Sequence, residues 1–183
     1  MKKLNRKGFT LIELLAVITI MSILMLVAIP AVARTIENTR RDTFANTALE
    51  YISAIEQAVL TDAIECESGE AGKYEAISAL PNRTEGYTYF FESNDDTGKD
   101  LMEQGGKSSW GNAHVKGVVT IVKKIDNDKN KTTYEYKIRM VDTSNRGIGT
   151  DTERSSVKRS AVKTSGQTAV TKPTDAYGCQ LVQ

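Results

Sequence analysis

One carboxylate stands at the start of a long apolar run, and it is the most unusual chemical group in the first part of the chain. Glu13 precedes the segment 14–33, in which only Thr19 and Ser22 are polar. Because a charged carboxylate is costly in lipid, an ionisable residue at such a position is expected to have a functional role. Pairing with a cation is the chemistry that suits it. The alternative is an interfacial position near the lipid headgroups.

Residues suited to catalysis are scarce. His114 is the only histidine, and the sequence contains none of the common motifs of nucleophilic, metal-dependent or nucleotide-binding enzymes. The segment 94–100 has the composition of a calcium loop, but Gly105 stands where an EF-hand would place its bidentate glutamate. We therefore expect no enzyme activity, no cofactor and no metal site.

The two cysteines, Cys66 and Cys179, lie far apart in the sequence and form no Cys-x-x-Cys pair. This arrangement argues against a zinc site or a thioredoxin-type redox site. They can form a long-range disulfide if the domain lies outside the cell, where such bonds persist. Two free thiols are the alternative.

Charge is distributed unevenly along the chain. The formal net charge is +1, and four of the 24 basic residues, Lys2, Lys3, Arg6 and Lys7, precede Gly8. The rest of the chain has 20 basic residues against 23 acidic ones, so it is mildly acidic. This balance argues against a nucleic-acid-binding protein held by bulk charge.

The apolar segment 14–33 is long enough to cross a membrane as a helix. About twenty residues rise about 30 Å, which matches the hydrocarbon thickness of a bilayer. The basic residues in front of it predict a cytoplasmic N-terminus and an external C-terminal portion. A cleaved secretory signal is the alternative, because Ala31-Val32-Ala33 has the small residues of a cleavage site. Glu13 argues against it, since a signal peptide has no use for a carboxylate.

The segment Gly8-Phe9-Thr10-Leu11-Ile12-Glu13-Leu14 is similar to the N-terminal motif of type IV pilins and pseudopilins. In that family a prepilin peptidase cuts after the glycine and methylates the new N-terminus. The resemblance therefore implies cleavage between Gly8 and Phe9, N-methylation of Phe9, and a retained helix that anchors the subunit until it enters a filament. In one respect the chain departs from the family: Ser22 and Ala28 occupy the region where many such helices have a glycine.

After that cleavage, Glu13 would lie four positions from a positively charged α-amine on Phe9. In a bundle of staggered helices this amine is buried among apolar side chains of neighbouring subunits, where neither charge is tolerable alone. Pairing Glu13 with the amine of an adjacent subunit neutralises both charges and favours a correct axial register. The resemblance implies the same filament-assembly role for this glutamate.

A single helix is expected from Phe9 to about Leu60, with a kink at Pro30, because proline removes a backbone donor and clashes with the preceding turn. Its second half, at 34–64, is amphipathic and is expected to end near the breakers of 66–72. Five apolar residues recur there at helical spacing and predict the side that faces the core: Phe44, Ala48, Ile52, Ile55 and Val59.

Three later segments have the composition of β-strands. Residues 87–91 are aromatic, residues 115–124 are rich in β-branched side chains, and residues 132–141 alternate between apolar and charged side chains. Residues 126–130 have the composition of a hairpin turn. The predicted fold is α+β, with a long N-terminal helix packed on an antiparallel sheet at about 87–141. Pilins and pseudopilins share this plan.

The polar region 142–183 is predicted to be a loop layer on the sheet or to be partly mobile. Four basic residues cluster within it: Arg154, Lys158, Arg159 and Lys163. A solvated surface is favoured over a site for DNA or polysaccharide, since no aromatic residue interleaves the charges for stacking.

These patterns divide the chain into a leader peptide at 1–8, a membrane and filament helix at 9–33, and an extracellular globular domain at 34–183. The expected function is that of a structural subunit of a type IV pilus, most like the major pilin of a Gram-positive, clostridial-type pilus. Such pili serve adhesion, twitching motility or biofilm formation. The expected partners are copies of the chain itself, the prepilin peptidase, the pilus assembly machinery and, before assembly, the cell membrane.

Two alternatives stay open. The first is a pseudopilin of a type II secretion or DNA-uptake machine, which uses the same helix in a short filament. The second is a secreted binding domain released by cleavage after Ala33. The large polar exterior favours the pilin, because it suits a long exposed fibre.

Overall fold

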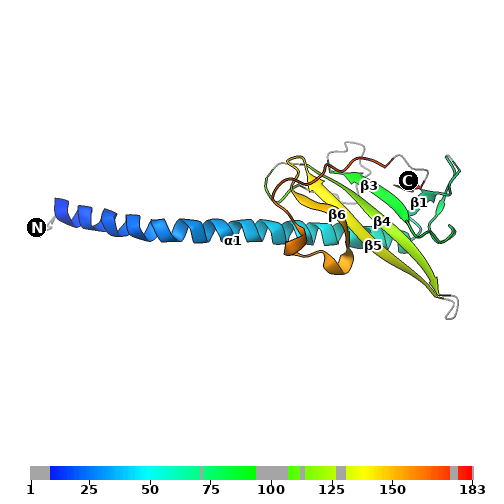
Figure 1. Cartoon of the computed structure of the whole chain (residues 1–183), viewed down its shortest axis with the longest axis horizontal. Helices are drawn as coiled ribbons and strands as arrows, with labels where there is room; N and C mark the ends of the chain where they lie inside the picture. The colour runs from blue at the N-terminus through cyan, green and yellow to red at the C-terminus, as the bar shows by residue number, and fades with distance from the viewer. Residues whose placement is uncertain are drawn as a thin grey trace, which may run out of the picture. The chain divides into compact units, whose positions relative to one another are not determined.

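The computed structural model describes residues 9–70, 72–93, 107–111, 114–126, 131–173 and 177–182. Within them, one long helix, α1 (Leu11–Leu60), precedes a seven-stranded sheet. The strands are β1 (Ile64–Glu67), β2 (Tyr74–Ala76), β3 (Tyr87–Glu92), β4 (Val115–Asp126), β5 (Lys131–Asp142), β6 (Gly147–Glu153) and β7 (Gly178–Leu181). Figure 1 shows the helix and labels β1, β3, β4, β5 and β6 of the sheet. Two 3-10 helices, η1 (Arg154–Ser156) and η2 (Arg159–Ala161), follow β6. The predicted α+β fold is confirmed.

The chain divides into two compact units, residues 1–39 and residues 40–183. In the first unit, the large apolar side chains from Leu11 to Val32 are 48% to 81% exposed. Among the described residues, α1 is the one helix that is long and apolar enough to cross a membrane, a criterion that a signal sequence also meets. So much uncovered apolar surface is unfavourable in water and requires either lipid or protein to cover it.

The second unit has its core between the last part of α1 and one face of the sheet. The side chains that α1 buries there are Phe44, Ala45, Ala48, Tyr51, Ile52, Ile55, Ala58 and Val59. The predicted core side of the helix is therefore confirmed. Tyr51 stacks on Phe91 of β3 with 4.0 Å between ring centroids. Gly117 of β4 makes room for this stack, since a Cβ there would lie 2.2 Å from the Phe91 ring.

The helix ends at Leu60, as first predicted, but before the breakers of 66–72, because Ile64–Glu67 is a strand. Asp62 has a left-handed backbone with φ 51°, and the Ala63 N–H donates to the Ala58 carbonyl at 2.8 Å. These are the features of a Schellman motif, which closes a helix C-terminus. The usual signal for this motif is glycine, and aspartate is one of the few other residues that tolerate this conformation.

The sheet has the order β2-β1-β7-β3-β4-β5-β6 and is antiparallel except where β7 pairs with β3. The predicted hairpin is its longest part, with β4 and β5 paired from Val115↔Asp142 to Asp126↔Lys131. The residues of its turn, 127–130, lie outside the described part of the chain.

The region after Asp142 differs from the predicted loop layer. It supplies the edge strand β6 and, in the middle of the sheet, β7. Between them, Val157 and Val162 enter the main core with 5% and 0% exposure. β7 pairs with β1 and β3, which lie far away in the sequence, so a polar local composition does not reveal it.

Candidate functional site

The first turn of α1 is closed by a reciprocal pair of side chains. Thr10 donates from its backbone N–H and from its hydroxyl to Oε2 of Glu13, at 2.8 Å each. The Glu13 N–H donates in return to the Thr10 hydroxyl oxygen at 3.3 Å. This is a capping box, in which two backbone donors of the first helical turn find side-chain acceptors.

The capping box places the Glu13 carboxylate beside the backbone of Thr10, one residue from the nitrogen of Phe9. The Phe9 side chain is 92% exposed. A carboxylate is stabilised so close to the start of a helix, because the helix dipole is positive there. Thr10 had no predicted role, although Thr10-Leu11-Ile12-Glu13 is itself the sequence signature of a capping box. Gly8, the other predicted cleavage residue, lies outside the described part of the chain.

The apolar part of the helix satisfies its own polar groups. The Thr19 hydroxyl donates to the Ala16 carbonyl at 2.9 Å, and the Ser22 hydroxyl donates to the Ile18 carbonyl at 2.7 Å. Such internal bonds are what a segment surrounded by lipid needs. Around Pro30, α1 continues without interruption, and the kink predicted there stays a prediction.

The two cysteines are cross-strand neighbours in the sheet. Cys66 on β1 lies opposite Cys179 on β7, and their Sγ atoms are joined at 2.05 Å. Cys66 is fully buried in the main core. The pairing considered from the sequence is therefore compatible with the strand register, and its formation in the oxidised protein is a prediction taken up below.

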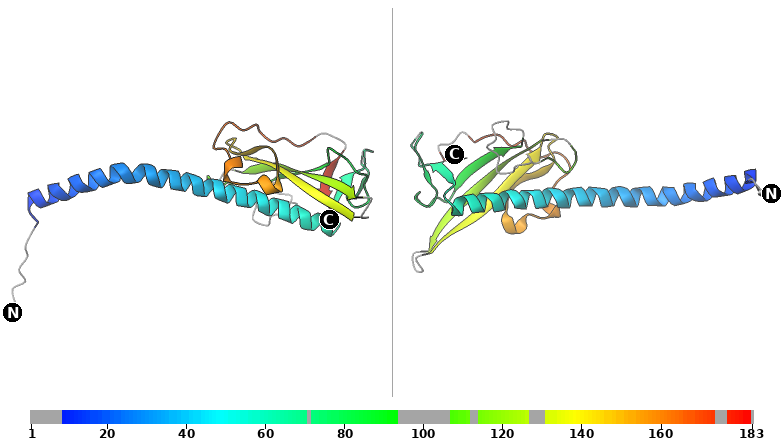
Figure 2. Two further views of the ribbon diagram at one scale, coloured as in Figure 1. Left: turned by 60° about the horizontal axis from the view of Figure 1, so that its bottom comes forward. Right: turned by 180° about the vertical axis from the view of Figure 1, so that it is seen from behind.

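The basic cluster of the polar region contacts the second half of α1. Arg154 forms an ion pair with Glu56, and Arg159 binds both carboxylate oxygens of Asp42 at 2.7 Å and 2.5 Å. Figure 2 shows η1 and η2, in orange, beside the cyan part of α1. All four basic side chains of the cluster are exposed to solvent, and two of its arginines also hold η1 and η2 against the helix.

Within the described ranges, no three histidine, cysteine, aspartate or glutamate side chains come together in a way that could hold a metal ion. The segment considered for calcium, 94–100, lies outside these ranges, as does Gly105. His114 lies just before β4 and forms an isolated bridge with Lys107.

Residues 3–29 match the family model of the prokaryotic N-terminal methylation motif. The match confirms the resemblance at the level of the motif and indicates a type IV pilin-like protein or a pseudopilin. No curated protein and no solved structure matches the chain. This motif is typical of structural subunits. It implies processing by a prepilin peptidase, membrane anchoring and assembly into filaments.

Proposed function

We propose that the chain is a subunit of a type IV pilus, most like the major pilin of a Gram-positive, clostridial-type pilus. The observation that carries the proposal is the N-terminal part of α1, which joins the methylation motif to an apolar surface left uncovered by the rest of the chain. In a filament, the corresponding helices of neighbouring subunits cover that surface. The filament then serves adhesion, twitching motility or biofilm formation.

Processing and location follow from the same segment. The leader at 1–8 is removed between Gly8 and Phe9, and Phe9 becomes N-methylated. Before assembly, the helix at 9–33 holds the subunit in the cell membrane with its N-terminus in the cytoplasm. After assembly, the domain at 34–183 is extracellular. Cleavage after Ala33 is disfavoured, because this residue lies in the interior of an unbroken helix.

The pilin is favoured over the pseudopilin by the construction of the globular domain. The joined cysteines suit a domain outside the cytoplasm, because disulfides persist in oxidising environments, and a pilin and a pseudopilin both meet this condition. The large polar exterior suits a long exposed fibre. A pseudopilin, by comparison, remains in a short filament within a secretion or DNA-uptake machine.

Electron microscopy of cells that lack the gene tests the proposal. Loss of all long fibres, and their return when the gene is restored, is the expected result for a major pilin. Normal fibres together with a secretion or DNA-uptake defect would instead support the pseudopilin.

A further inference from the structure

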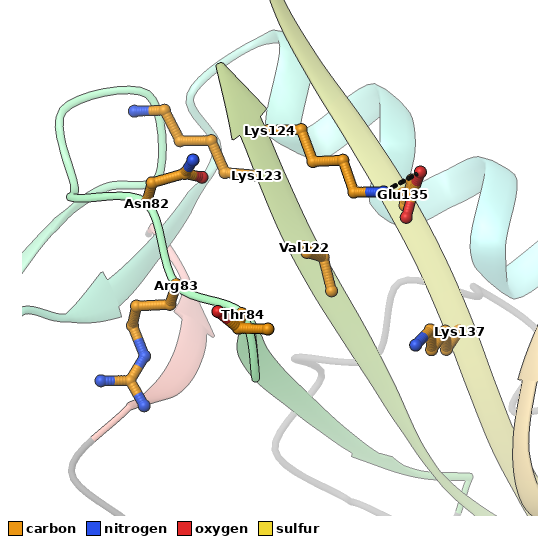
Figure 3. Close-up of a pocket in the computed structure, with 8 residues that line it drawn as sticks. All are labelled: Asn82, Arg83, Thr84, Val122, Lys123, Lys124, Glu135 and Lys137. Atoms are coloured by element: carbon orange, nitrogen blue, oxygen red, sulfur yellow. Dashed lines mark hydrogen bonds and ion pairs between the residues drawn. The ribbon is translucent and has the colours of Figure 1, made fainter. Parts of the chain in front are cut away.

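A hollow of about 340 Å³ lies on the globular domain, over the outer face of the β4–β5 hairpin. Its lining residues are Asn82, Arg83, Thr84, Val122, Lys123, Lys124, Glu135 and Lys137. Ile121 and Tyr136 belong to the main core, so Val122 and Lys137, which follow them, point to the opposite face of the sheet. Figure 3 shows Asn82, Arg83 and Thr84 on the loop that forms the other side.

This loop, residues 81–86, is held firmly at both ends. The Tyr87 hydroxyl donates to the Pro81 carbonyl at 2.9 Å. The ammonium of Lys123, a residue only 6% exposed, donates to the carbonyls of Ser78 and Leu80 at 2.6 Å and 2.7 Å. At the other end, Gly86 has φ +76°, and a Cβ there would lie 2.6 Å from the Ile121 carbonyl oxygen. The side of the hollow that this loop forms is therefore preorganised, which lowers the entropic cost of binding a ligand.

The residues that line the hollow carry an excess of positive charge. Four of them are cationic, but the Lys123 ammonium is already bound to the Ser78 and Leu80 carbonyls. The one carboxylate, Glu135, is bound by Lys124 at 2.6 Å. Arg83 lies over the Tyr177 ring at the rim and pairs with the exposed Glu85. Lys137 makes no ion pair with any residue of the described part of the chain. Its ammonium is thus available to an external anion.

The neutral groups define the ligand further. The Asn82 amide and the Thr84 hydroxyl both donate and accept hydrogen bonds, as the hydroxyl groups of a sugar require. No aromatic side chain lines the hollow, so the stacking platform that single-stranded nucleic acids use is missing from it. We propose that this hollow binds a carboxylated sugar unit of an acidic polysaccharide, with Lys137 at the carboxylate and Asn82 and Thr84 at the ring hydroxyls.

This inference goes beyond the proposed function, because a binding site on the domain stands or falls independently of filament assembly. It is tested by isothermal titration calorimetry of the full chain in detergent with polygalacturonate, at about 0.15 M ionic strength to screen diffuse attraction. Lys137→Glu should weaken binding about tenfold or more, since it replaces a charge-assisted hydrogen bond by repulsion. Lys137→Met removes the charge with less risk to folding and should have the same direction of effect.

The matched control is Lys158→Glu, which makes the same change in net charge at an exposed lysine of the basic cluster, away from the hollow. It should leave the affinity unchanged within about twofold, given the short reach of screened charges. An equal loss in both glutamate variants, or no loss in either lysine 137 variant, would overturn the proposed site. If single-stranded DNA displaced bound polygalacturonate as well as free polygalacturonate does, the assignment to a sugar would be overturned. Dextran carries no carboxylate and should not compete with polygalacturonate. Competition by dextran would contradict the proposal that the hollow recognises a carboxylate.

Discussion

Glu13 has one carboxylate and two candidate partners for it. In the described structure it caps the first turn of α1 through Thr10. In the proposed filament it pairs with the α-amine of Phe9 on a neighbouring subunit. The capping box requires a hydrogen-bond acceptor at this position, which glutamine also supplies, whereas the pairing requires a negative charge. The two roles can therefore be separated by substitution.

The first prediction uses this difference. Glu13→Ala and Glu13→Gln should both insert in the membrane and be cut after Gly8, yet both should build few or no filaments. Removing one partner of a buried ion pair costs roughly 3 to 5 kcal/mol, so the glutamine variant should fail despite its intact cap. Counts of fibres by electron microscopy, at equal protein level, measure the outcome. Normal assembly of Glu13→Gln alone would show that Glu13 acts by capping the helix. Normal assembly of both variants would show that Glu13 has neither role and is an interfacial residue near the lipid headgroups.

Asp142, at the end of β5, is the buried carboxylate with the most partners in the described domain. It is 2% exposed and accepts hydrogen bonds from the Arg146 side chain and the Ser108 hydroxyl at 2.8 Å, and from the Ser144 N–H at 2.9 Å. Burial alone would raise the pKa of Asp142, but these hydrogen bonds together outweigh burial, so its pKa is lowered. The ionised form is therefore the one that stabilises the fold.

The second prediction is a pH dependence. Because the folded pKa of Asp142 lies below the unfolded value of about 3.9, its contribution is complete above that value and is lost as the pH falls through the folded pKa. Asp142→Asn should lower the free energy of unfolding at neutral pH by about 2 kcal/mol, the scale of hydrogen bonds to a charged group. Urea unfolding of the detergent-solubilised chain should show this difference shrinking below about pH 4.

The control for this experiment is Asp151→Asn, since the Asp151 side chain is 51% exposed and pairs with Arg139 across 3.6 Å. Exposed pairs of this kind contribute about 1 kcal/mol or less, so this variant should unfold almost like the unsubstituted chain at every pH. A deficit in Asp142→Asn that is the same at pH 7 and at pH 3 would contradict the assignment.

At the scale of elements, β7 joins two parts of the sheet. It lies between β1 and β3, so it links the small β1–β2 hairpin to the rest of the sheet. β7 is a strand of four residues in a polar stretch and has little intrinsic preference for its place. Cys179 lies opposite Cys66, so a disulfide between them would hold β7 beside β1.

The third prediction is that the oxidised protein contains the Cys66–Cys179 disulfide. Closing a loop of this length stabilises the fold by about 4 to 5 kcal/mol in the chain-entropy model. Peptide mapping without reductant should recover the two cysteines in one linked peptide, and Cys66→Ala/Cys179→Ala should unfold at lower urea concentration. Reductant should destabilise the unsubstituted chain and leave the double variant unaffected. Recovery of two freely alkylated thiols would refute the bond.

At the scale of the whole molecule, the chain joins two units that require different surroundings. Residues 40–183 bury a core of their own, whereas the apolar side chains between Leu11 and Val32 are largely uncovered. The first unit therefore needs a membrane or other copies of itself to cover these side chains. Processing of the N-terminus decides whether the chain that is covered in this way begins at Met1 or at Phe9.

The fourth prediction concerns this processing. Mass spectrometry of the protein assembled on the cell surface should find N-methyl-Phe9 as its first residue, because the methylation motif spans the leader and the start of the helix. A variant with Gly8→Leu should keep residues 1–8 and stay in the membrane fraction, since the small residue before the cut is lost. A mature chain that begins at Arg34 would instead identify a conventional signal peptide and overturn the pilin proposal.

The sequence alone determined the features that depend on residues close together in the chain. The motif around Gly8 and Glu13, the apolar run at 14–33, the core side of α1 and the β4–β5 hairpin are all visible as short patterns, because helices and hairpins are built from local contacts. Even the capping box of Thr10 and Glu13 was readable, since its two members are three residues apart.

The tertiary structure decided what depends on distant partners. The place of β7 inside the sheet and the approach of Cys179 to Cys66 are set by neighbours that no local pattern reveals. The hollow around Lys137 is another case, since it needs the loop at 81–86 to lie over two strands that follow much later in the chain. Side chains from such separate segments meet only when the core behind them has formed, and for that reason sequence spacing does not predict them.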